Sequence, residues 1–263
     1  MKKSKKLFNF IYNIVVMYKS IFLLLCLCGP ILGYLFGSIL FAIIFSKIFK
    51  HQDIRKFGSH NPGFTNSLRT YGSKISAFVL ILDMLKIIIP TIIIFLLIKF
   101  IDTFNNSINE LNLKYDFNFN FLLYLTPVFG IIGHIFPIYF KFKGGKGVSS
   151  YFALLLLISP FLFVICALLL IAIVIIKKIM SIASLSTIII LPFLFLVPGV
   201  NYFYLSEQNF VLTIKYTIDP NTFLWLLPIF GILVVISLLI IYKHHKNIIN
   251  IIKKKEPTLS FLK

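Results

Sequence analysis

The chain is made largely of apolar runs that are long enough to cross a lipid bilayer. A helix needs about 20 apolar residues to cross roughly 30 Å of hydrocarbon at about 1.5 Å per residue. Hydrophobic residues make up 59% of the 263 residues, whereas a soluble domain holds about 45–50%. The sequence therefore predicts an all-α integral membrane protein, a polytopic bundle. Its apolar runs occupy residues 21–46, 75–98, 121–140, 148–176, 179–199 and 221–242.

One of these runs is interrupted by a proline. Ser159-Pro160 lies inside residues 148–176, and a proline ends or kinks a helix because it has no N–H to donate. We expect two short helices that fold back at Pro160, since interrupted backbone is tolerated at membrane depth where protein covers it. The bundle then has about seven transmembrane helices.

The distribution of charge predicts the orientation. The formal net charge is +18, and lysine and arginine gather in the segments 47–74, 141–147 and 243–256. Such segments face the cytoplasm and contact anionic lipid, which explains scattered bases better than nucleic-acid binding does. We expect a multi-pass protein of the plasma membrane with a cytoplasmic active site, the lipid bilayer as a partner, and no nucleic acid.

Two signals conflict over the side of the membrane on which the N-terminus lies. Residues 1–20 are a basic extension whose short apolar stretch, 7–18, predicts an interfacial helix rather than a span. The parity of the later spans places it outside, although its lysines favour the cytoplasm, and an additional pass by residues 7–28 is the alternative. Residues 21–263 are expected to form one domain, because no repeat or linker divides them.

A loop of alternating lysine and glycine follows the third run. Glycine lets backbone N–H groups approach a ligand closely or adopt positive φ, and lysine supplies counter-charge to an anion. The N-terminus of the following helix adds its positive dipole end. An ordinary positive loop is the alternative, but topology alone does not require glycine. We expect a phosphate site, without a nucleotide because the Walker spacing is absent. Its residues are Lys141, Lys143, Gly144, Gly145, Lys146 and Gly147.

The loop 58–69 is a second candidate site. It combines glycine and proline with a high density of hydrogen-bonding side chains, more than an irregular turn segment needs. These side chains belong to Ser59, Asn61, Thr65, Asn66 and Arg69. We expect them to bind an anionic or hydroxylated ligand.

Several further polar residues lie in or beside the spans. His134 precedes the lysine–glycine loop and is either catalytic or a satisfied helix-end histidine. Asp83 and Lys86 share one helix face inside a span, where charges pair or line a polar site. His244 and Asn247 follow the last span one helical turn apart.

Metal, cofactor and disulfide chemistry are not expected. Cys26, Cys28 and Cys166 lie in apolar runs, which predicts buried thiols rather than disulfides or a metal site. Acidic residues are scarce near the candidate site, so no metal and no cofactor are expected there.

Three motifs resemble those of the bacterial acyl-phosphate-dependent glycerol-3-phosphate acyltransferases. The resemblance runs from about Gly33 to Glu256. The first motif is matched by Gly58, Ser59, Asn61, Gly63, Thr65, Asn66 and Arg69. The second is matched by Gly133, His134, Phe136, Pro137, Lys141, Lys143, Gly144, Gly145, Lys146 and Gly147. The third is matched by His244, Asn247, Ile248 and Glu256, and shorter similarities include Gly37-Ser38-Ile39, Asp83 with Lys86, and Ser181 to Ser184.

This resemblance implies transfer of a fatty acyl group from acyl phosphate to the 1-hydroxyl of glycerol 3-phosphate, giving lysophosphatidic acid and phosphate, the first acylation in phospholipid synthesis. It implies catalytic roles for His244, Asn247, Ser59 and Arg69. It implies substrate binding by Ser38, Asn61, Gly63, Thr65, Asn66, His134, Lys141, Lys143, Gly144, Gly145, Lys146, Gly147 and Ser184. The partners implied are glycerol 3-phosphate, acyl phosphate and the soluble enzyme that makes acyl phosphate.

Five departures from the family pattern keep other functions open. The family commonly has glycine at two of these positions, alanine, proline and arginine at the others, and the residues here are His60 and Lys254, Phe64, Leu40 and Asn250. A degenerate, inactive homologue is therefore one alternative. A membrane transporter or channel for a phosphorylated solute is the other, although no duplicated halves are visible.

Overall fold

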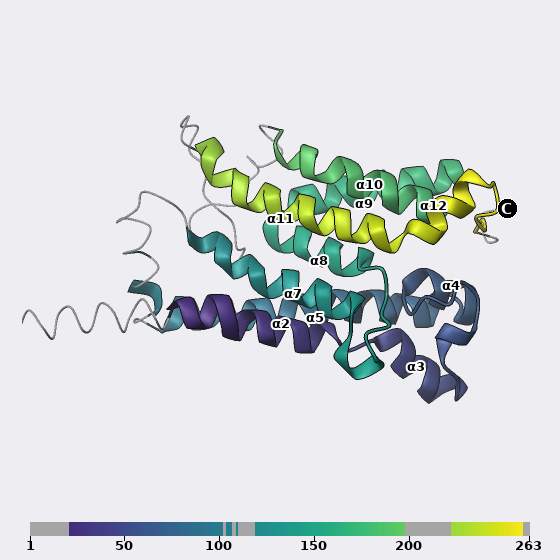
Figure 1. Ribbon diagram of the computed structural model, residues 1–263, viewed down its shortest axis with the longest axis horizontal. Coiled ribbons are helices and arrows are strands. Elements are labelled where there is room, and N and C mark those ends of the chain that lie inside the picture. Colours follow the sequence, from purple (N-terminus) through teal and green to yellow (C-terminus); the bar gives the residue numbers. More distant parts are fainter. Residues whose placement is uncertain (1–20, 102–103, 107–108, 110–118, 198–221, 260–263) are drawn as a thin grey trace, which may run out of the picture.

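The computed structural model describes residues 21–101, 104–106, 109, 119–197 and 222–259, and the described secondary structure is helical throughout. Five helical stretches are long and apolar enough to cross a membrane: Ile21–Lys50, Ser73–Phe100, Phe121–Phe140, Pro160–Lys177 and Leu226–Lys243. Two shorter apolar helices, Val148–Ile158 and Met180–Phe195, complete the bundle (Figure 1). The predicted all-α membrane architecture is confirmed, while the predicted N-terminal extension, 1–20, lies outside the described residues.

The first span, expected as one helix, is interrupted near its basic end. A π-helical turn, Leu24–Cys28, leads into α2 (Gly29–Gly37), and α3 (Phe41–Lys50) follows. At the interruption Leu40 is extended, with φ −104°. The Ser38 hydroxyl donates to the Tyr34 carbonyl at 2.8 Å. The interruption makes the Ile39 carbonyl available to a side chain of another helix.

Close packing of α2 on α7 (Leu125–Ile135) depends on glycine. Added Cβ atoms at Gly33 and Gly37 would overlap the backbone of Thr126 and Gly130. The two glycines, four residues apart, therefore permit the two helices to pack closely.

The segment 58–69 is only half irregular. Its second half belongs to α4 (Phe64–Tyr71), which follows the 3₁₀ turn η2 (Ile54–Lys56) and precedes α5 (Ser73–Phe100). The first half is held by Asn66, whose Nδ2 donates to Ile54 O at 3.2 Å and Phe57 O at 3.0 Å. A buried asparagine in a helix thus replaces the backbone partners that an irregular loop lacks.

The predicted break at Pro160 is confirmed. α8 (Val148–Ile158) ends at Ser159, whose Oγ accepts the Leu162 N–H at 3.2 Å, and α9 (Pro160–Lys177) begins there. The eleven residues of α8 rise about 16 Å, roughly half of the hydrocarbon thickness. α9, unlike the short helix expected, is long enough to cross a membrane.

The remaining elements close the bundle around α8 (Figure 1). They are η3 (Phe119–Tyr124), η4 (Ile138–Phe140), α10 (Met180–Phe195), α11 (Thr222–Lys243) and α12 (His245–Ile252). In the core, Tyr151 of α8 donates its hydroxyl to the Leu233 carbonyl of α11 at 3.0 Å.

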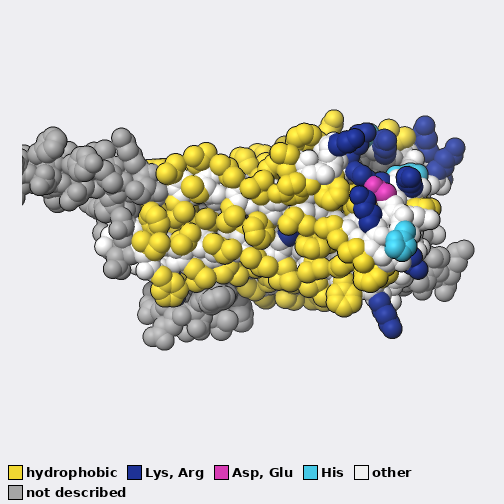
Figure 2. Space-filling view, turned by 90° about the horizontal axis from the view of Figure 1, so that it is seen from below, with side chains coloured by type: hydrophobic (Ala, Val, Ile, Leu, Met, Phe, Trp, Pro, Cys, Tyr) yellow, Lys and Arg dark blue, Asp and Glu magenta, His cyan; other side chains and the backbone are white. Residues whose placement is uncertain are grey.

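Charge gathers at one end of the molecule. In Figure 2 the sides of the bundle are apolar, and lysine, arginine and histidine side chains cluster at the end where α3, α4 and α12 lie. Cys166 is buried, as expected, but Cys26 and Cys28 are exposed on the surface. They lie on the first span, at positions that the bundle does not cover.

Candidate active site

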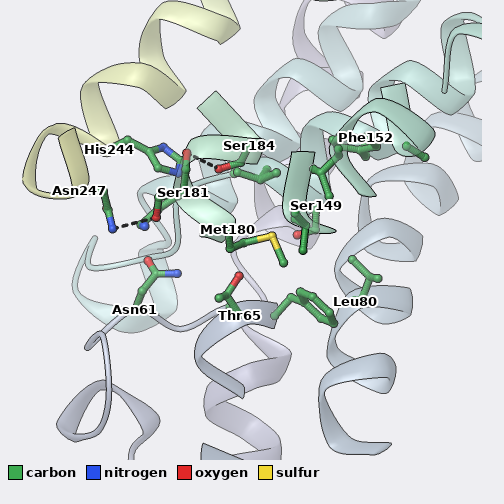
Figure 3. A pocket seen from close by; sticks show the side chains of 18 of the residues that line it. Asn61, Thr65, Leu80, Ser149, Phe152, Met180, Ser181, Ser184, His244 and Asn247 are labelled. Carbon is green, nitrogen blue, oxygen red and sulfur yellow. Dashed lines mark hydrogen bonds between the residues drawn. The ribbon is translucent and has the colours of Figure 1, made fainter. Parts of the chain in front are cut away.

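A cavity of about 500 Å³ lies at the basic end of the bundle. The three polar segments predicted to share one face meet there, together with the N-termini of α8 and α10. Figure 3 shows His244, Asn247 and Ser181 on one side of it, with Asn61 and Thr65 across from them. Eleven sequence-predicted site residues line the cavity: Ser59, Asn61, Gly63, Thr65, Arg69, His134, Lys146, Gly147, Ser184, His244 and Asn247.

Two cations of the cavity wall have no anionic partner within ion-pair distance among the described residues: Lys146 and Arg69. Burial lowers the pKa of Lys146 to about 8, with Glu256 opposing the shift and Arg69 adding to it. Burial also lowers the pKa of Arg69. The Arg69 Nε is buried without a hydrogen-bond partner, and one Nη donates to the Pro257 carbonyl at 3.1 Å. Partly buried cations without an anionic partner favour binding of an anion.

His244 lies at the turn between α11 and α12, and its tautomer follows from one contact. The Nδ1 atom is 2.8 Å from the Ile240 carbonyl oxygen, which only accepts, so Nδ1 carries the proton. Nε2 is therefore an acceptor. Burial lowers the pKa of His244 to about 4, and the nearby Lys146 charge contributes, so the ring is neutral near pH 7.

Asn247 is oriented by the C-terminal segment. Its Nδ2 donates to Glu256 Oε1 at 2.7 Å and to Ser181 Oγ at 3.1 Å. Ser181 itself donates to Glu256 Oε1 at 2.5 Å. Because the amide nitrogen is occupied, the Asn247 carbonyl oxygen remains available as an acceptor at the cavity.

The lysine–glycine loop contributes less directly than expected. Lys141 and Lys143 are exposed and do not line the cavity. Lys141 and Phe142 have positive φ, 56° and 57°, and turn the chain outward at this point. Only Lys146 and Gly147 reach the cavity wall.

Gly144 and Gly145 of this loop pack against His134 and do not line the cavity. A Cβ at Gly144 would overlap the His134 carbonyl, and one at Gly145 would overlap its imidazole. These two glycines therefore allow close approach, whereas Gly147, with φ 92°, requires the left-handed conformation.

Ser38 and Asn66 also lie outside the cavity lining. Asn66 Oδ1 accepts the Ser59 N–H at 2.9 Å, so it holds Ser59 in place. Ser38 Oγ accepts the Ile138 N–H at 3.4 Å. Both support loops that lead to the site.

An apolar wall completes the cavity, and the sequence did not single out its residues. Its side chains come from α5, α8, α9 and the start of α10: Leu80, Met84, Phe152, Phe163, Ala167, Leu170, Ile171, Val174, Ile175 and Met180. Ile171 and Ile175 are also 52% and 59% exposed, so this wall extends to the lipid-facing surface. In an apolar run nothing distinguishes a cavity residue from a lipid-facing one.

Two hydroxyl-bearing residues of the wall were not predicted as site residues either, Ser149 and Ser181. The sequence signal for Ser181 was its place in the small polar Ser181–Ser184 element. Ser149 lies in the first turn of α8, two residues after the N-cap Gly147, and no motif marked it.

Comparison with known proteins gives a consistent result. Residues 27–254 match the family model described as glycerol-3-phosphate acyltransferase. A glycerol-3-phosphate acyltransferase of Ureaplasma parvum serovar 3 is 38% identical over 250 residues, which is 94% of this chain and 91% of the relative. One of Mycoplasma pneumoniae is 38% identical over 241 residues, 91% and 96% of the two chains.

Solved structures agree. The crystal structure of PlsY (YgiH), an integral membrane glycerol 3-phosphate acyltransferase, in its glycerol 3-phosphate form has a TM-score of 0.67 and 28% identity. It covers 90% of this chain and 96% of that one. Its lysophosphatidic acid form has a TM-score of 0.66, with 26% identity over the same shares.

Proposed function

The chain belongs to the glycerol-3-phosphate acyltransferase family and is a membrane acyltransferase of glycerol 3-phosphate, and on this premise we propose that its acyl donor is an acyl phosphate. The fatty acyl group is transferred from acyl phosphate to the 1-hydroxyl of glycerol 3-phosphate, and the products are lysophosphatidic acid and inorganic phosphate.

One observation supports this donor above others: a single cavity joins unpaired cations to an apolar wall that reaches the lipid-facing surface. An acyl phosphate has the same two parts, a phosphate and a chain that belongs in lipid. The polar end of the cavity carries two cations, Lys146 and Arg69, so it can also bind a second phosphate.

The proposed chemistry needs no covalent intermediate on the protein. The hydroxyl oxygen of glycerol 3-phosphate attacks the acyl carbonyl carbon, and the bond from that carbon to the phosphate oxygen breaks. Phosphate is a good leaving group, so positioning and charge stabilisation account for the catalysis. With a pKa of about 4, His244 is a weak base. It orients the hydroxyl through Nε2, and the released phosphate takes the proton.

The phosphates are assigned to different walls. Lys146, Gly147 and the first turn of α8 hold glycerol 3-phosphate, where backbone N–H groups and the helix dipole favour an anion. Arg69 binds the acyl phosphate, because a guanidinium suits bidentate phosphate contact. Asn247 helps to position glycerol 3-phosphate through its side-chain oxygen. Ser59, Asn61, Gly63, Thr65 and Ser184 complete the polar wall.

We also propose that the basic end faces the cytoplasm, in a plasma-membrane protein whose residues 21–263 act as one domain. Lysine and arginine gather at that end (Figure 2), in keeping with the positive-inside bias. A soluble enzyme that makes acyl phosphate is then on the same side as the cavity.

The donor is tested with purified protein in lipid. Palmitoyl phosphate should give phosphate release and lysophosphatidic acid only when glycerol 3-phosphate is added, and palmitoyl-CoA should give no product. Turnover with palmitoyl-CoA instead would overturn the proposed donor. Absence of turnover with either donor would favour the inactive homologue.

The glycerol 3-phosphate site is tested by a matched pair in one loop. Lys146→Ala removes a cation from the cavity wall, and Lys143→Ala removes an exposed one. A hydrogen bond to a charged group contributes about 1.5–3 kcal/mol. The KM for glycerol 3-phosphate should therefore rise roughly 10- to 100-fold in the first variant only. Equal KM values in the two variants would contradict the assignment.

A further inference from the structure

A buried lysine contacts three groups inside the bundle. The side chain of Lys86 is 1% exposed. Its Nζ lies 2.6 Å from the Ile39 carbonyl oxygen, 2.9 Å from Asp83 Oδ1 and 2.9 Å from His134 Nδ1. The first of these partners is free because α2 and α3 are interrupted there.

The contact with Lys86 fixes the proton on the His134 ring. An ammonium has three N–H donors and no acceptor, and the ion pair with Asp83 keeps Lys86 in that charged form. His134 Nδ1 must therefore accept. A protonated imidazolium is unfavourable at 2.9 Å from an ammonium, so the ring is neutral and its proton lies on Nε2.

The other edge of this ring lies at the substrate cavity. His134 borders the cavity, and Nε2 makes no hydrogen bond within the described part of the chain. That edge faces Gly145, where a Cβ would overlap Nε2. The Gly145 N–H donates to the His134 carbonyl at 3.0 Å, so the ring and the loop that carries Lys146 are held together.

We propose that the Asp83–Lys86 pair positions His134 as a neutral Nε2–H donor to an oxygen of the phosphate held by Lys146. The phosphate assignment rests on the proposed function, whereas the tautomer does not. His134 then has the opposite tautomer to His244, whose Nδ1 donates to Ile240 and whose Nε2 accepts. His134 donates, His244 accepts, and His134 is not a proton acceptor in the reaction.

Nitrogen-15 NMR of histidine-labelled protein in lipid nanodiscs tests the tautomer directly. The full chain has five histidines, and the signals of His134 are those that vanish in His134→Gln. The proposal expects an unprotonated Nδ1 and a protonated Nε2, with the Nε2 signal moving when inorganic phosphate is added. Protonated Nδ1, or an Nε2 signal that phosphate does not move, would overturn it.

A matched pair of neutral double variants separates positioning from simple structural support. Asp83→Asn with Lys86→Gln keeps an N–H donor for Nδ1, and Asp83→Asn with Lys86→Met removes it without leaving a buried charge. The glutamine variant should keep the tautomer. The methionine variant should lose it, and its KM for glycerol 3-phosphate should rise roughly 10-fold relative to the glutamine variant, as expected for about 1.5 kcal/mol.

Thermal unfolding of both variants checks that they fold alike. Identical tautomers and identical KM values in folded samples would assign the pair a structural role only and overturn the proposal. If either variant does not fold, the wild-type spectra alone decide. Because the spectra require no turnover, their outcome is independent of whether acyl phosphate is the donor.

Discussion

Lys146 and Arg69 are two cations that line the same cavity, and the Glu256 carboxylate near them is hydrogen-bonded to other groups. Glu256 Oε1 accepts from Ser181 and Asn247, and no ion pair joins Glu256 to either cation within the described residues. A partly buried charge without a partner loses hydration that only a ligand restores. The site is therefore completed by its substrates.

The pKa of Lys146 gives the pH dependence of this site. Lysine is charged below its pKa, here about 8 in the free protein, and only the charged form attracts phosphate. The groups that face it are Arg69, Glu256 and His244, and His244 has a pKa of about 4 and stays neutral above pH 6. We expect kcat/KM for glycerol 3-phosphate to fall about tenfold per pH unit well above pH 8.

Lys146→Arg is the control, because a guanidinium stays protonated to far higher pH. Its alkaline decline should disappear while activity at neutral pH partly remains. An unchanged alkaline decline in this variant would assign the titration to another group. The measurement is kcat/KM between about pH 6 and pH 10, corrected for hydrolysis of acyl phosphate without enzyme.

Backbone conformation explains why glycine is common at two positions where this chain has another residue. His60 and Lys254, which stand where glycine is common, have φ values of 58° and 55°. The left-handed region costs a non-glycine residue about 1–2 kcal/mol. His60 Nδ1 lies 2.9 Å from the Arg55 carbonyl, a local contact that offsets part of this cost. Lys254 is exposed.

Lys254→Gly should therefore stabilise the protein, by up to about 1 kcal/mol after the greater freedom of glycine in the unfolded chain is subtracted. Lys253→Gly is the matched control, since Lys253 is also exposed but has φ −78°. Glycine there should lower stability by about 0.5–1 kcal/mol. Unfolding midpoints in one detergent, compared with wild type, measure both. A lower midpoint for Lys254→Gly would contradict the argument.

Helix features that depend on adjacent residues were predicted from the sequence, whereas features that depend on contacts between distant residues were not. Ser159-Pro160 places a capping hydroxyl and a proline at the start of α9, and both signals lie within two adjacent residues. The interruption at Ser38–Leu40 carries no proline, and its role becomes clear only from Lys86, 47 residues from Ile39. The same holds for His134, whose partner is 48 residues away.

The structure brings together the predicted site residues whose side chains meet at the cavity, and it places Lys141 and Lys143 of the loop outside the cavity lining. Lys141 and Phe142 have positive φ values and direct the loop outward. Neither residue is a glycine, so the sequence did not predict this turn. The apolar wall could not be predicted because lipid-facing and cavity-facing residues of α9 are chemically alike.

The apolar wall of α9 yields a test of where the acyl chain binds. Ala167→Phe places a ring in the cavity, and Leu168→Phe changes a neighbouring side chain that is 61% exposed. Displacing two methylenes from the wall costs about 1.6 kcal/mol. The KM for palmitoyl phosphate should rise roughly tenfold in Ala167→Phe, and less for octanoyl phosphate. An effect on the KM for glycerol 3-phosphate instead would place the chain elsewhere.

Across the whole molecule, the described chain begins and ends at opposite ends of the bundle. The purple segment with which the described chain begins lies at the end away from the basic cluster, and α12 lies within that cluster (Figures 1 and 2). α8 and α9 enter and return at the basic end, which accounts for this parity.

Which end faces the cytoplasm is predicted by charge. Lys99 lies at the end of α5 away from the basic cluster, whereas Lys253, Lys254 and Lys255 follow α12 within it. Near an anionic leaflet each lysine contributes about 1 kcal/mol of attraction. The basic end should therefore face the cytoplasm. Asn109, an exposed residue that follows α5, should lie on the other side.

Labelling of single cysteines with an impermeant maleimide in spheroplasts tests this orientation. The background carries Cys26→Ala and Cys28→Ala, which removes the two exposed thiols, and keeps the buried Cys166. Asn109→Cys should react in intact spheroplasts, and Lys253→Cys only after permeabilisation. The reverse pattern would place the cavity on the external face. Acyl phosphate made in the cytoplasm would then have no direct access to it, so the labelling result bears on the donor as well as on the topology.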